Sequence, residues 1–393
     1  MSARTIHPFP ARMAPDIALD AIPERSPDRQ LLVIDPMCGS GTVLSAAAQR
    51  GQRALGIDID PLAVMMSKVA TSKADFTGIC ATADSLVQHA QATKAATPWT
   101  DDETDRFADY WFGASQRNQL IRLTAAIQSV EDSSLRSALQ VALSRIIVTK
   151  SPQASLAADT SHSRPHRVLL ESEYDVYAGF QKSTRSLARL LEGRAHTGSA
   201  TVLLGDSRTL GGVADGSADL AVTSPPYLNA LDYLRGHKLA LIWFGHSIPS
   251  LREIRRDSIG AERGLDGPAE TLASELASMV TDSATDPSLL PTRTILRFAN
   301  DMVRFSRQLR RVLNVDGSAV VVVGNSTLKG NYIRNDLITQ HAMESNGFAL
   351  AERHEREIPP QNRYMATKST GSNDSVTKRM RYEIVLTMKG AAA

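Results

Sequence analysis

Hydrophobic positions in the first part of the chain follow the pattern of a parallel α/β sheet. The run 31–35 (LLVID) is short, apolar and β-branched, and an Ala-rich helical stretch, 43–50, follows a Gly-rich turn. A second strand-like run, 53–58 (RALGID), leads into another helical stretch that begins at Pro61. A strand, a turn, a helix and a second strand in this order predict a βαβ unit, and therefore a parallel sheet.

The hydrophobic period changes between residues 75 and 195. Amphipathic helical spacing fills 101–151, and another helix is expected over 172–192. The stretch between them, 151–167, is polar and contains prolines and histidines. We therefore interpret 75–195 as a mainly helical insertion into a sheet domain formed by 1–74 and 196–393.

Strand-like runs return after this insertion. Strands are predicted at 200–205, 219–223, 318–324, 349–358 and 381–389, and helices at 293–313 and 333–346. The valine-rich run 318–324 is typical of a buried parallel strand, whereas the last two strands can pair as an antiparallel hairpin. Residues 248–291 are rich in Gly, Pro, Ser and Asp, which predicts an irregular surface excursion.

Composition narrows the class of protein. The 393 residues are 42% hydrophobic and 22% charged, as in a globular protein with an ordinary core. No run approaches the roughly 20 apolar residues of a membrane span, and the N-terminus has no apolar signal core, so we expect a cytoplasmic protein without a membrane partner. The two cysteines, Cys38 and Cys80, exclude a disulfide framework, and no zinc-like spacing predicts a metal.

The formal net charge is only +2, so overall charge does not identify a nucleic-acid partner. Basic side chains nevertheless cluster in two segments, and clustered basic residues can neutralise phosphates. The candidate DNA-binding residues are Arg255, Arg256, Arg363, Lys368 and Arg379. A solvated charged surface is the alternative interpretation of both segments.

The turn after the first strand has the features of a nucleoside-binding loop. Gly39 and Gly41 allow a tight bend and a close approach of the backbone to a ligand. The helix that begins near Thr42 offers free N–H groups, but no lysine follows Gly41, so the turn is not a P-loop. Asp58 ends the next strand, where a carboxylate can accept hydrogen bonds from ribose hydroxyls.

A second motif, Thr223-Ser224-Pro225-Pro226-Tyr227, follows a later strand. Its prolines hold the backbone extended, so the Ser224 hydroxyl and the Pro225 carbonyl are fixed at the carboxyl edge of the sheet. Two neighbouring acceptors suit an NH₂ group, which has two protons to donate. Tyr227 offers a flat face on which a base can stack.

These two motifs, DPMCGSGT (35–42) and TSPPY (223–227), resemble those of S-adenosylmethionine-dependent amino-methyltransferases that act on DNA, most closely the N4-cytosine type. The segment 7–13 (HPFPARM) and Asp206 are similar to weaker signals of that family. The resemblance implies a Rossmann-like class I methyltransferase sheet and S-adenosylmethionine as the cofactor. The implied cofactor-binding residues are His7, Pro8, Phe9, Asp35, Pro36, Cys38, Gly39, Gly41, Thr42, Asp58 and Asp206. The implied catalytic residues are Ser224, Pro225, Pro226 and Tyr227.

The resemblance also implies a mechanism. Hydrogen bonds to Ser224 and the Pro225 carbonyl make the lone pair of the amino nitrogen available, and the flipped base stacks on Tyr227. No metal and no covalent intermediate is required. A C5-cytosine enzyme needs a nucleophilic cysteine, typically after a proline, and neither Cys38 nor Cys80 has that context.

Several alternatives remain open at this stage. The target can be adenine N6 instead of cytosine N4, or the substrate can be RNA. The chain can also be a non-catalytic cofactor-binding subunit of a defence complex, and a restriction or defence-system subunit is a candidate partner beside DNA. Target recognition is expected in 75–195 first and in 248–291 second, although the insertion can equally support the sheet or mediate dimerisation. His237 is expected either to face the DNA or to cap the polar side of its helix.

Overall fold

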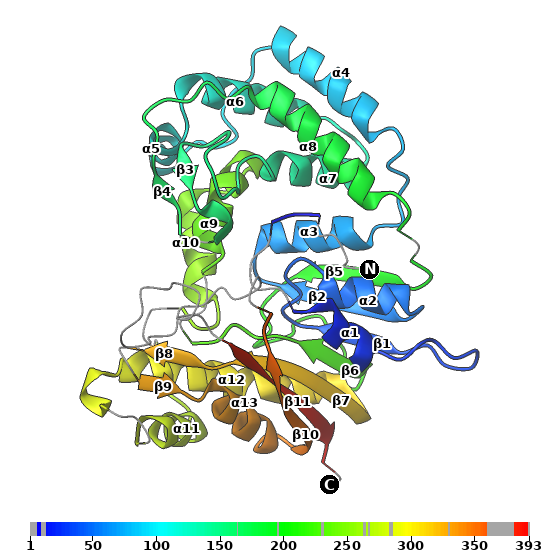
Figure 1. Ribbon diagram of the computed structural model, residues 1–393, viewed down its shortest axis with the longest axis vertical. Helices are drawn as coiled ribbons and strands as arrows, with labels where there is room; N and C mark the ends of the chain where they lie inside the picture. Colours follow the sequence, from blue (N-terminus) through cyan, green and yellow to red (C-terminus); the bar gives the residue numbers. More distant parts are fainter. Residues whose placement is uncertain are drawn as a thin grey trace.

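A seven-stranded sheet forms the centre of the computed structural model (Figure 1). The structure describes residues 6–8, 13–162, 164–194, 196–228, 232–261, 265, 268–282, 286–328, 331–359 and 381–391. The strands are β1 (Leu32–Asp35), β2 (Arg53–Asp58), β5 (Ser199–Leu204), β6 (Ala218–Thr223), β7 (Leu313–Gly324), β10 (Phe348–Glu357) and β11 (Tyr382–Gly390). All the predicted strands are therefore present.

The strand order is β10-β11-β7-β6-β1-β2-β5. Strands β7, β6, β1, β2 and β5 pair in parallel, whereas β11 runs antiparallel to both β7 and β10. The predicted mostly parallel sheet with an antiparallel C-terminal hairpin is thus confirmed. This is the topology of the Rossmann-like class I methyltransferase fold.

Helices cover both faces of the sheet because the strands are apolar on both sides. Within β1, Val33 packs in the core shared with α1 and α2, whereas its neighbour Ile34 packs on the opposite face, in the core shared with α11, α12 and α13. The helices of the first face are α1 (Pro15–Ala21), α2 (Thr42–Gln49) and α3 (Pro61–Thr71). Those of the second face are α11 (Thr271–Asp282), α12 (Thr292–Val312) and α13 (Asn335–Glu344).

A separate layer of helices stands over α3 (Figure 1). Its members from the predicted insertion are α4 (Ile79–Ala92), α5 (Asp102–Trp111), α6 (Ala114–Gln128), α7 (Ser133–Ser144) and α8 (Val176–Leu191). The mainly helical character predicted for 75–195 is confirmed by these elements. The core of this layer also takes in Leu239 of α9 (Leu234–Leu241), Trp243 of a 3₁₀ turn (Ile242–Phe244) and Leu251 of α10 (Ile248–Asp257). By packing, the helical layer therefore extends beyond the predicted insertion.

The prediction that 248–291 is irregular is wrong, because this range holds α10, α11 and a 3₁₀ turn (Pro287–Leu289). In α10 only Ile248 and Leu251 are buried, so the short apolar face was masked by its arginines. In α11 the positions Ala273, Leu276, Ala277 and Val280 share one face and pack in the core with α12. Pro249 lies in the first turn of α10, where proline is tolerated, and the described Gly260 and Pro291 lie outside α10 and α11.

Two small hairpins complete the described structure. One consists of β3 (Ala157–Ala158) and β4 (His166–Arg167), joined through a 3₁₀ turn (Thr160–His162), and it belongs to the helical layer. The other, β8 (Ser326–Leu328) with β9 (Asn331–Ile333), follows β7. Within the described ranges, every helix is too short or too polar to span a bilayer.

Candidate active site

The two sequence motifs meet at the carboxyl edge of neighbouring strands. Strands β1 and β6 pair in parallel, so the turn after Asp35 and the loop after Thr223 leave the sheet side by side. A buried hydrogen bond joins them directly, with Thr223 Oγ1 donating to Asp35 Oδ1 at 2.8 Å. Asp35 is 4% exposed and also accepts a hydrogen bond from the backbone N–H of Met37. One carboxylate therefore anchors both motifs.

The glycines of the first loop are required by its geometry. Gly39 and Gly41 have positive φ angles of 50° and 82°, a region that favours glycine. A Cβ at Gly41 would lie 3.0 Å from Ser67 Oγ and 3.1 Å from Ser67 Cα, on the facing helix α3. Ser67 in turn donates to the Gly39 carbonyl at 2.7 Å, which holds the turn against α3.

Asp58, at the end of β2, shapes the same turn from the other side. Its Oδ2 accepts the backbone N–H of Gly39 at 2.8 Å, and its Oδ1 accepts that of Asp60 at 2.9 Å. Asp60, directly before Pro61, is the N-cap of helix α3. Its side chain accepts a hydrogen bond from the Leu62 N–H at 2.9 Å. The predicted residues Asp35, Gly39, Gly41 and Asp58 are thus brought together around one turn.

Burial perturbs the carboxyls of this turn. It raises the pKa of Asp35 to about 7, with the Thr223 hydrogen bond opposing the shift. It raises the pKa of Asp58 to about 6, and the negative charge of Asp60 adds to the effect. No lysine or arginine is among the main causes of these two pKa shifts. When ionised, at pH values above these pKa values, the two carboxylates suit a cationic ligand.

Cys38 lies in the same turn as a buried thiol. Burial raises its pKa well above the ordinary value, and the charges of Asp58 and Asp35 act in the same direction. A thiol held in this way is a poor nucleophile, which agrees with the exclusion of a cysteine-dependent mechanism. Among the described residues, no cluster of His, Cys, Asp and Glu has the arrangement of a metal site.

The second motif is held by the adjacent strand β7. Ser224 is half-buried, and its hydroxyl donates to the Val322 carbonyl at 3.0 Å. Pro225 is buried and Pro226 is half-buried. The serine oxygen keeps lone pairs available as an acceptor, since its own proton is directed to Val322. The arrangement is compatible with the predicted acceptor role.

Tyr227 differs from its expected exposure. The side chain is 9% exposed and packs in the core that includes Ile259, and burial raises its pKa well above the ordinary value. The segment after α10 covers this loop, since a Cβ at Gly260 would lie 3.2 Å from the Tyr227 carbonyl. An open stacking face is therefore absent at Tyr227 in this structure.

The sequence interpretation missed a polar cluster on α9. His237 is 2% exposed, and its Nδ1 lies 2.5 Å from Asp60 Oδ2, so its side chain is buried against Asp60 rather than exposed to solvent. Tyr233, one turn earlier, stacks near the His237 ring with 6.4 Å between centroids. The charge of Asp58 is among the influences that raise the pKa of Tyr233, after burial. Helix α9 thus packs against the start of α3, beside the turn that holds Gly39 and Asp58, which no local motif in the sequence indicated.

The N-terminal segment contributes to the same cluster. His7 is fully buried, its Nε2 lies 3.0 Å from Ser144 Oγ, and its ring meets His237 edge-on at 6.4 Å. Burial lowers the pKa of His7 well below its ordinary value, and the charge of His237 acts in the same direction. Pro8 is exposed, and Phe9 lies outside the described residues.

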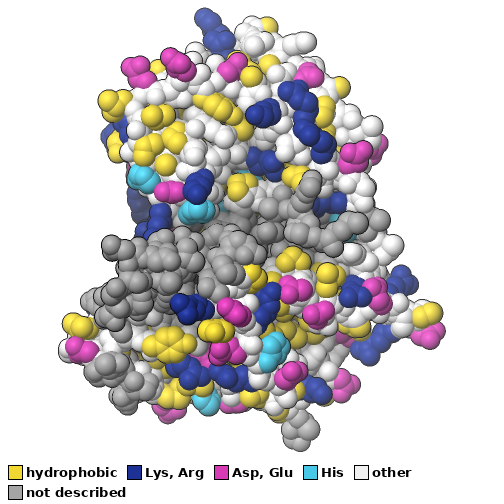
Figure 2. Space-filling model, viewed as in Figure 1, with side chains coloured by type: hydrophobic (Ala, Val, Ile, Leu, Met, Phe, Trp, Pro, Cys, Tyr) yellow, Lys and Arg dark blue, Asp and Glu magenta, His cyan; other side chains and the backbone are white. Residues whose placement is uncertain are grey.

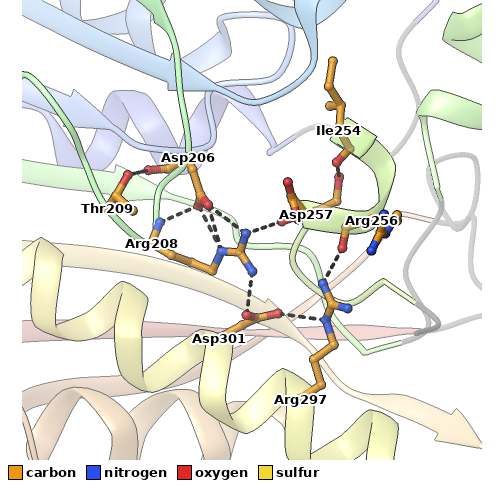
Figure 3. Close-up of polar contacts among 9 residues, drawn as sticks. Asp206, Arg208, Thr209, Ile254, Arg256, Asp257, Arg297 and Asp301 are labelled. Carbon is orange, nitrogen blue, oxygen red and sulfur yellow. Dashed lines mark hydrogen bonds and ion pairs between the residues drawn. The ribbon is translucent and has the colours of Figure 1, made fainter. Parts of the chain in front are cut away.

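Asp206 follows the edge strand β5, and its carboxylate is paired with an arginine (Figure 3). Arg208 Nε donates to both oxygens at 3.0 and 3.1 Å, and its Nη2 donates to Oδ2 at 2.7 Å. The same guanidinium reaches Asp301 Oδ1 of α12 at 2.9 Å and the Asp257 carbonyl at 2.5 Å. Asp206 therefore belongs to a partly buried charge cluster that joins the end of α10 to the sheet.

The candidate DNA-binding residues divide into two groups. Arg255 pairs with Asp232, and Arg256 pairs with Glu253 at 2.8 Å, so both guanidiniums have acidic partners. Arg363, Lys368 and Arg379 lie outside the described residues.

No protein-family model matches the sequence, and no curated protein does. Several solved structures similar to this chain are described as S-adenosylmethionine-dependent methyltransferases. One from Methanosarcina mazei has 9% identity and a TM-score of 0.32, covering 94% of this chain and 100% of that chain. Geranyl diphosphate C-methyltransferase from Streptomyces coelicolor has 8% identity and a TM-score of 0.35, covering 96% and 75%.

A candidate DNA modification methylase from Thermus thermophilus is also similar, with 15% identity and a TM-score of 0.23, covering 48% of this chain and 52% of that chain. The descriptions of the last two name different substrates, geranyl diphosphate and DNA. The fold of the present chain follows from its own strand order, and its site from its own residues.

Proposed function

We propose that this chain is an S-adenosylmethionine-dependent methyltransferase that acts on the exocyclic amino group of a base in DNA, with cytosine N4 as the preferred target. The observation that carries the proposal is the hydrogen bond between Thr223 and Asp35. It ties a loop with the features of a cofactor turn to a Ser-Pro-Pro-Tyr loop at one sheet edge. Ligands of open α/β sheets bind at such an edge, so a cofactor and an acceptor there would be neighbours.

The charge of the turn supports S-adenosylmethionine over a phosphate-bearing cofactor. The cofactor carries a sulfonium and an ammonium group, both cationic, and the carboxyls of Asp35, Asp58 and Asp60 lie around the turn. A dinucleotide or nucleoside triphosphate would bring anionic phosphates to the same place, where like charges repel. When bound, the cofactor supplies an activated methyl group.

The protein's own residues then have three tasks. Asp58 and the Gly39–Gly41 turn hold the cofactor, the Ser224 oxygen accepts a hydrogen bond from the target NH₂ group, and helix α9 closes the site. Because the methyl group is already activated, alignment of the amino nitrogen is the main catalytic requirement. Adenine N6 is the second candidate, since its amino group offers the same two protons to the same acceptors.

The function is tested with unmethylated genomic DNA and S-adenosylmethionine, followed by nuclease digestion and mass spectrometry of the nucleosides. We expect N4-methyldeoxycytidine, and N6-methyldeoxyadenosine would move the target to adenine. Binding of the cofactor without any methylated deoxynucleoside would contradict the DNA substrate. A parallel incubation with total RNA distinguishes an RNA methyltransferase from a non-catalytic subunit.

The affinity for S-adenosylmethionine is expected to rise with pH between about 5 and about 8. The pKa of Asp58 is raised to about 6 and that of Asp35 to about 7, so both are protonated in acid and become anionic across this range. As the pH rises, ionisation of these two carboxyls destabilises the ligand-free fold, whereas a bound cation stabilises the ionised form. Isothermal titration calorimetry at several pH values measures the slope.

The control for this pH dependence is Asp58→Asn, which cannot ionise. The variant should bind S-adenosylmethionine more weakly, and its affinity should vary less with pH than that of the wild type. An unchanged slope in the variant would show that the ionisation of Asp58 does not contribute to binding of the cofactor.

A further inference from the structure

Helices α9 and α10 carry a cluster of basic side chains beside the Ser-Pro-Pro-Tyr loop. The two helices pack together at the side of the helical layer, and α10 also packs against α5 (Figure 1). The basic side chains are Arg235, Lys238, Arg252 and Arg255. On the face drawn in Figure 2, Lys and Arg side chains lie at the left margin, at the height where Figure 1 places these two helices.

The cluster lies next to this loop because both helices converge on it. Asp232 follows the loop and precedes α9, and its Oδ2 accepts a hydrogen bond from Arg235 Nε at 3.2 Å and another from Arg255 of α10. Beyond α10 the chain returns to the loop, where Ile259 packs in the same core as Tyr227. A single carboxylate therefore ties the start of α9 to the end of α10 at the edge of the candidate site.

Lys238 differs from the arginines of the cluster because it has no acidic partner. Asp232 is already shared by two arginines, and Glu103 of α5 pairs with Arg252. Among the described residues, neither a carboxylate nor any other hydrogen-bond acceptor pairs with Lys238 Nζ, which lies 5.0 Å from the centre of the Phe107 ring. The ring holds the ammonium group in place but replaces a counter-anion only in part.

The surroundings of Lys238 are unfavourable for a cation. Burial lowers the pKa of Lys238, and the charges of three arginines, first that of Arg255, act in the same direction. The charge of Asp232 opposes this shift. A bound anion would stabilise the ammonium group, and the side chain is only half-buried, so part of its surface remains in contact with solvent.

A phosphate is the anion that suits this position. A lysine ammonium is a compact point charge that binds phosphate, whereas a carboxylate is matched better by the planar fork of an arginine. A base whose amino group reaches Ser224 remains attached to its strand, so the phosphates of that strand have to pass close to the loop that receives the base. Lys238 lies on the helix that follows this loop, and its ammonium group can therefore meet the strand.

We propose that Lys238 is a phosphate ligand that holds the backbone of the DNA strand carrying the target base. This inference rests on the proposed function. A phosphate contact releases about one counterion from the DNA, so its loss makes binding less dependent on salt. A lysine that only packs α9 against α5 has no such effect, because it neutralises no phosphate.

The experiment measures the Kd of a fluorescent duplex by anisotropy at several salt concentrations, with DNA that the wild type methylates. Lys238→Met keeps an unbranched side chain over Phe107 and removes the charge. Its plot of log Kd against log salt concentration should be less steep than that of the wild type by about 0.9, and its affinity at low salt should fall about fivefold or more. Lys238→Arg, which keeps the charge, should keep the wild-type slope. Lys94→Met is the matched control, because Lys94 is exposed beyond the end of α4.

An unchanged slope in Lys238→Met would overturn the phosphate site, even if the affinity falls, because the lysine would then act through packing alone. An equal decrease of the slope in Lys94→Met would overturn it as well, since any surface lysine would have the same effect. A wild type that methylates no DNA would contradict the proposed function, and this role of Lys238 with it. An unchanged slope on DNA that is methylated contradicts the phosphate site alone, so the two failures are distinguishable.

Discussion

Replacing Ser224 by alanine is expected to lower the rate of methyl transfer by about 10²-fold or more while S-adenosylmethionine affinity stays within about twofold. The substitution removes an acceptor for the target amino group. It also removes the hydrogen bond to the Val322 carbonyl that fixes the loop to β7. The cofactor turn is held separately by Asp58 and Ser67, so its geometry should survive.

Single-turnover kinetics and calorimetric titration of the cofactor measure the two effects independently. Ser217→Ala is the matched control, because Ser217 is exposed, precedes the same strand at its other end and bonds only locally to the Ala214 carbonyl among the contacts described. A Ser224→Ala variant that transfers methyl groups at the wild-type rate contradicts the role of the serine. A parallel loss of cofactor binding contradicts the separation of the two loops.

The second large effect concerns stability. Removing the carboxylate with Asp301→Ala should lower the free energy of unfolding by about 3–5 kcal/mol. Asp301 is 2% exposed and lies 2.9 Å from Arg208 and 3.7 Å from Arg297, which are themselves nearly buried (Figure 3). Without it, two guanidiniums remain in a poorly solvated place with one counter-charge fewer.

Urea denaturation followed by circular dichroism measures this loss. The control is Asp215→Ala, which removes an exposed partner of Arg311 and should cost less than about 1 kcal/mol. An Asp301→Ala variant as stable as this control would show that water or Asp206 compensates the arginines. The same variant also tests the contact between α12 and α10, because Arg297 of α12 donates a hydrogen bond to the Arg256 carbonyl at the end of α10.

The sheet could be predicted because its strands have a strong local signal. The runs around Val33 and Val322 are apolar on both faces. The two glycines of the first turn predict the bend that follows β1. Helix α10 could not be predicted in the same way, because only Ile248 and Leu251 are buried and Ile254 is partly buried against the same core. A helix with so narrow an apolar face is recognised only when its packing partner is known.

The candidate site shows the same division. Asp35 and Ser224 were found from motifs, each local in sequence. Other contacts around the site, such as the one between Asp60 and His237, join residues that are far apart in the sequence and belong to no motif. Asp206 and Tyr227 illustrate a further difficulty, because their types were suggestive but their partners and burial depend on distant segments.

The position of β11 has a consequence for biosynthesis. This strand comes after every other strand of the sheet in the chain, yet it lies between β7 and β10. While the ribosome is still making it, β7 and β10 have no neighbour on the facing edges, and each exposes a row of unpaired backbone groups. The sheet can therefore be completed by β11 only after translation has passed Gly390. Nascent chains that pause earlier should be the ones most in need of a chaperone.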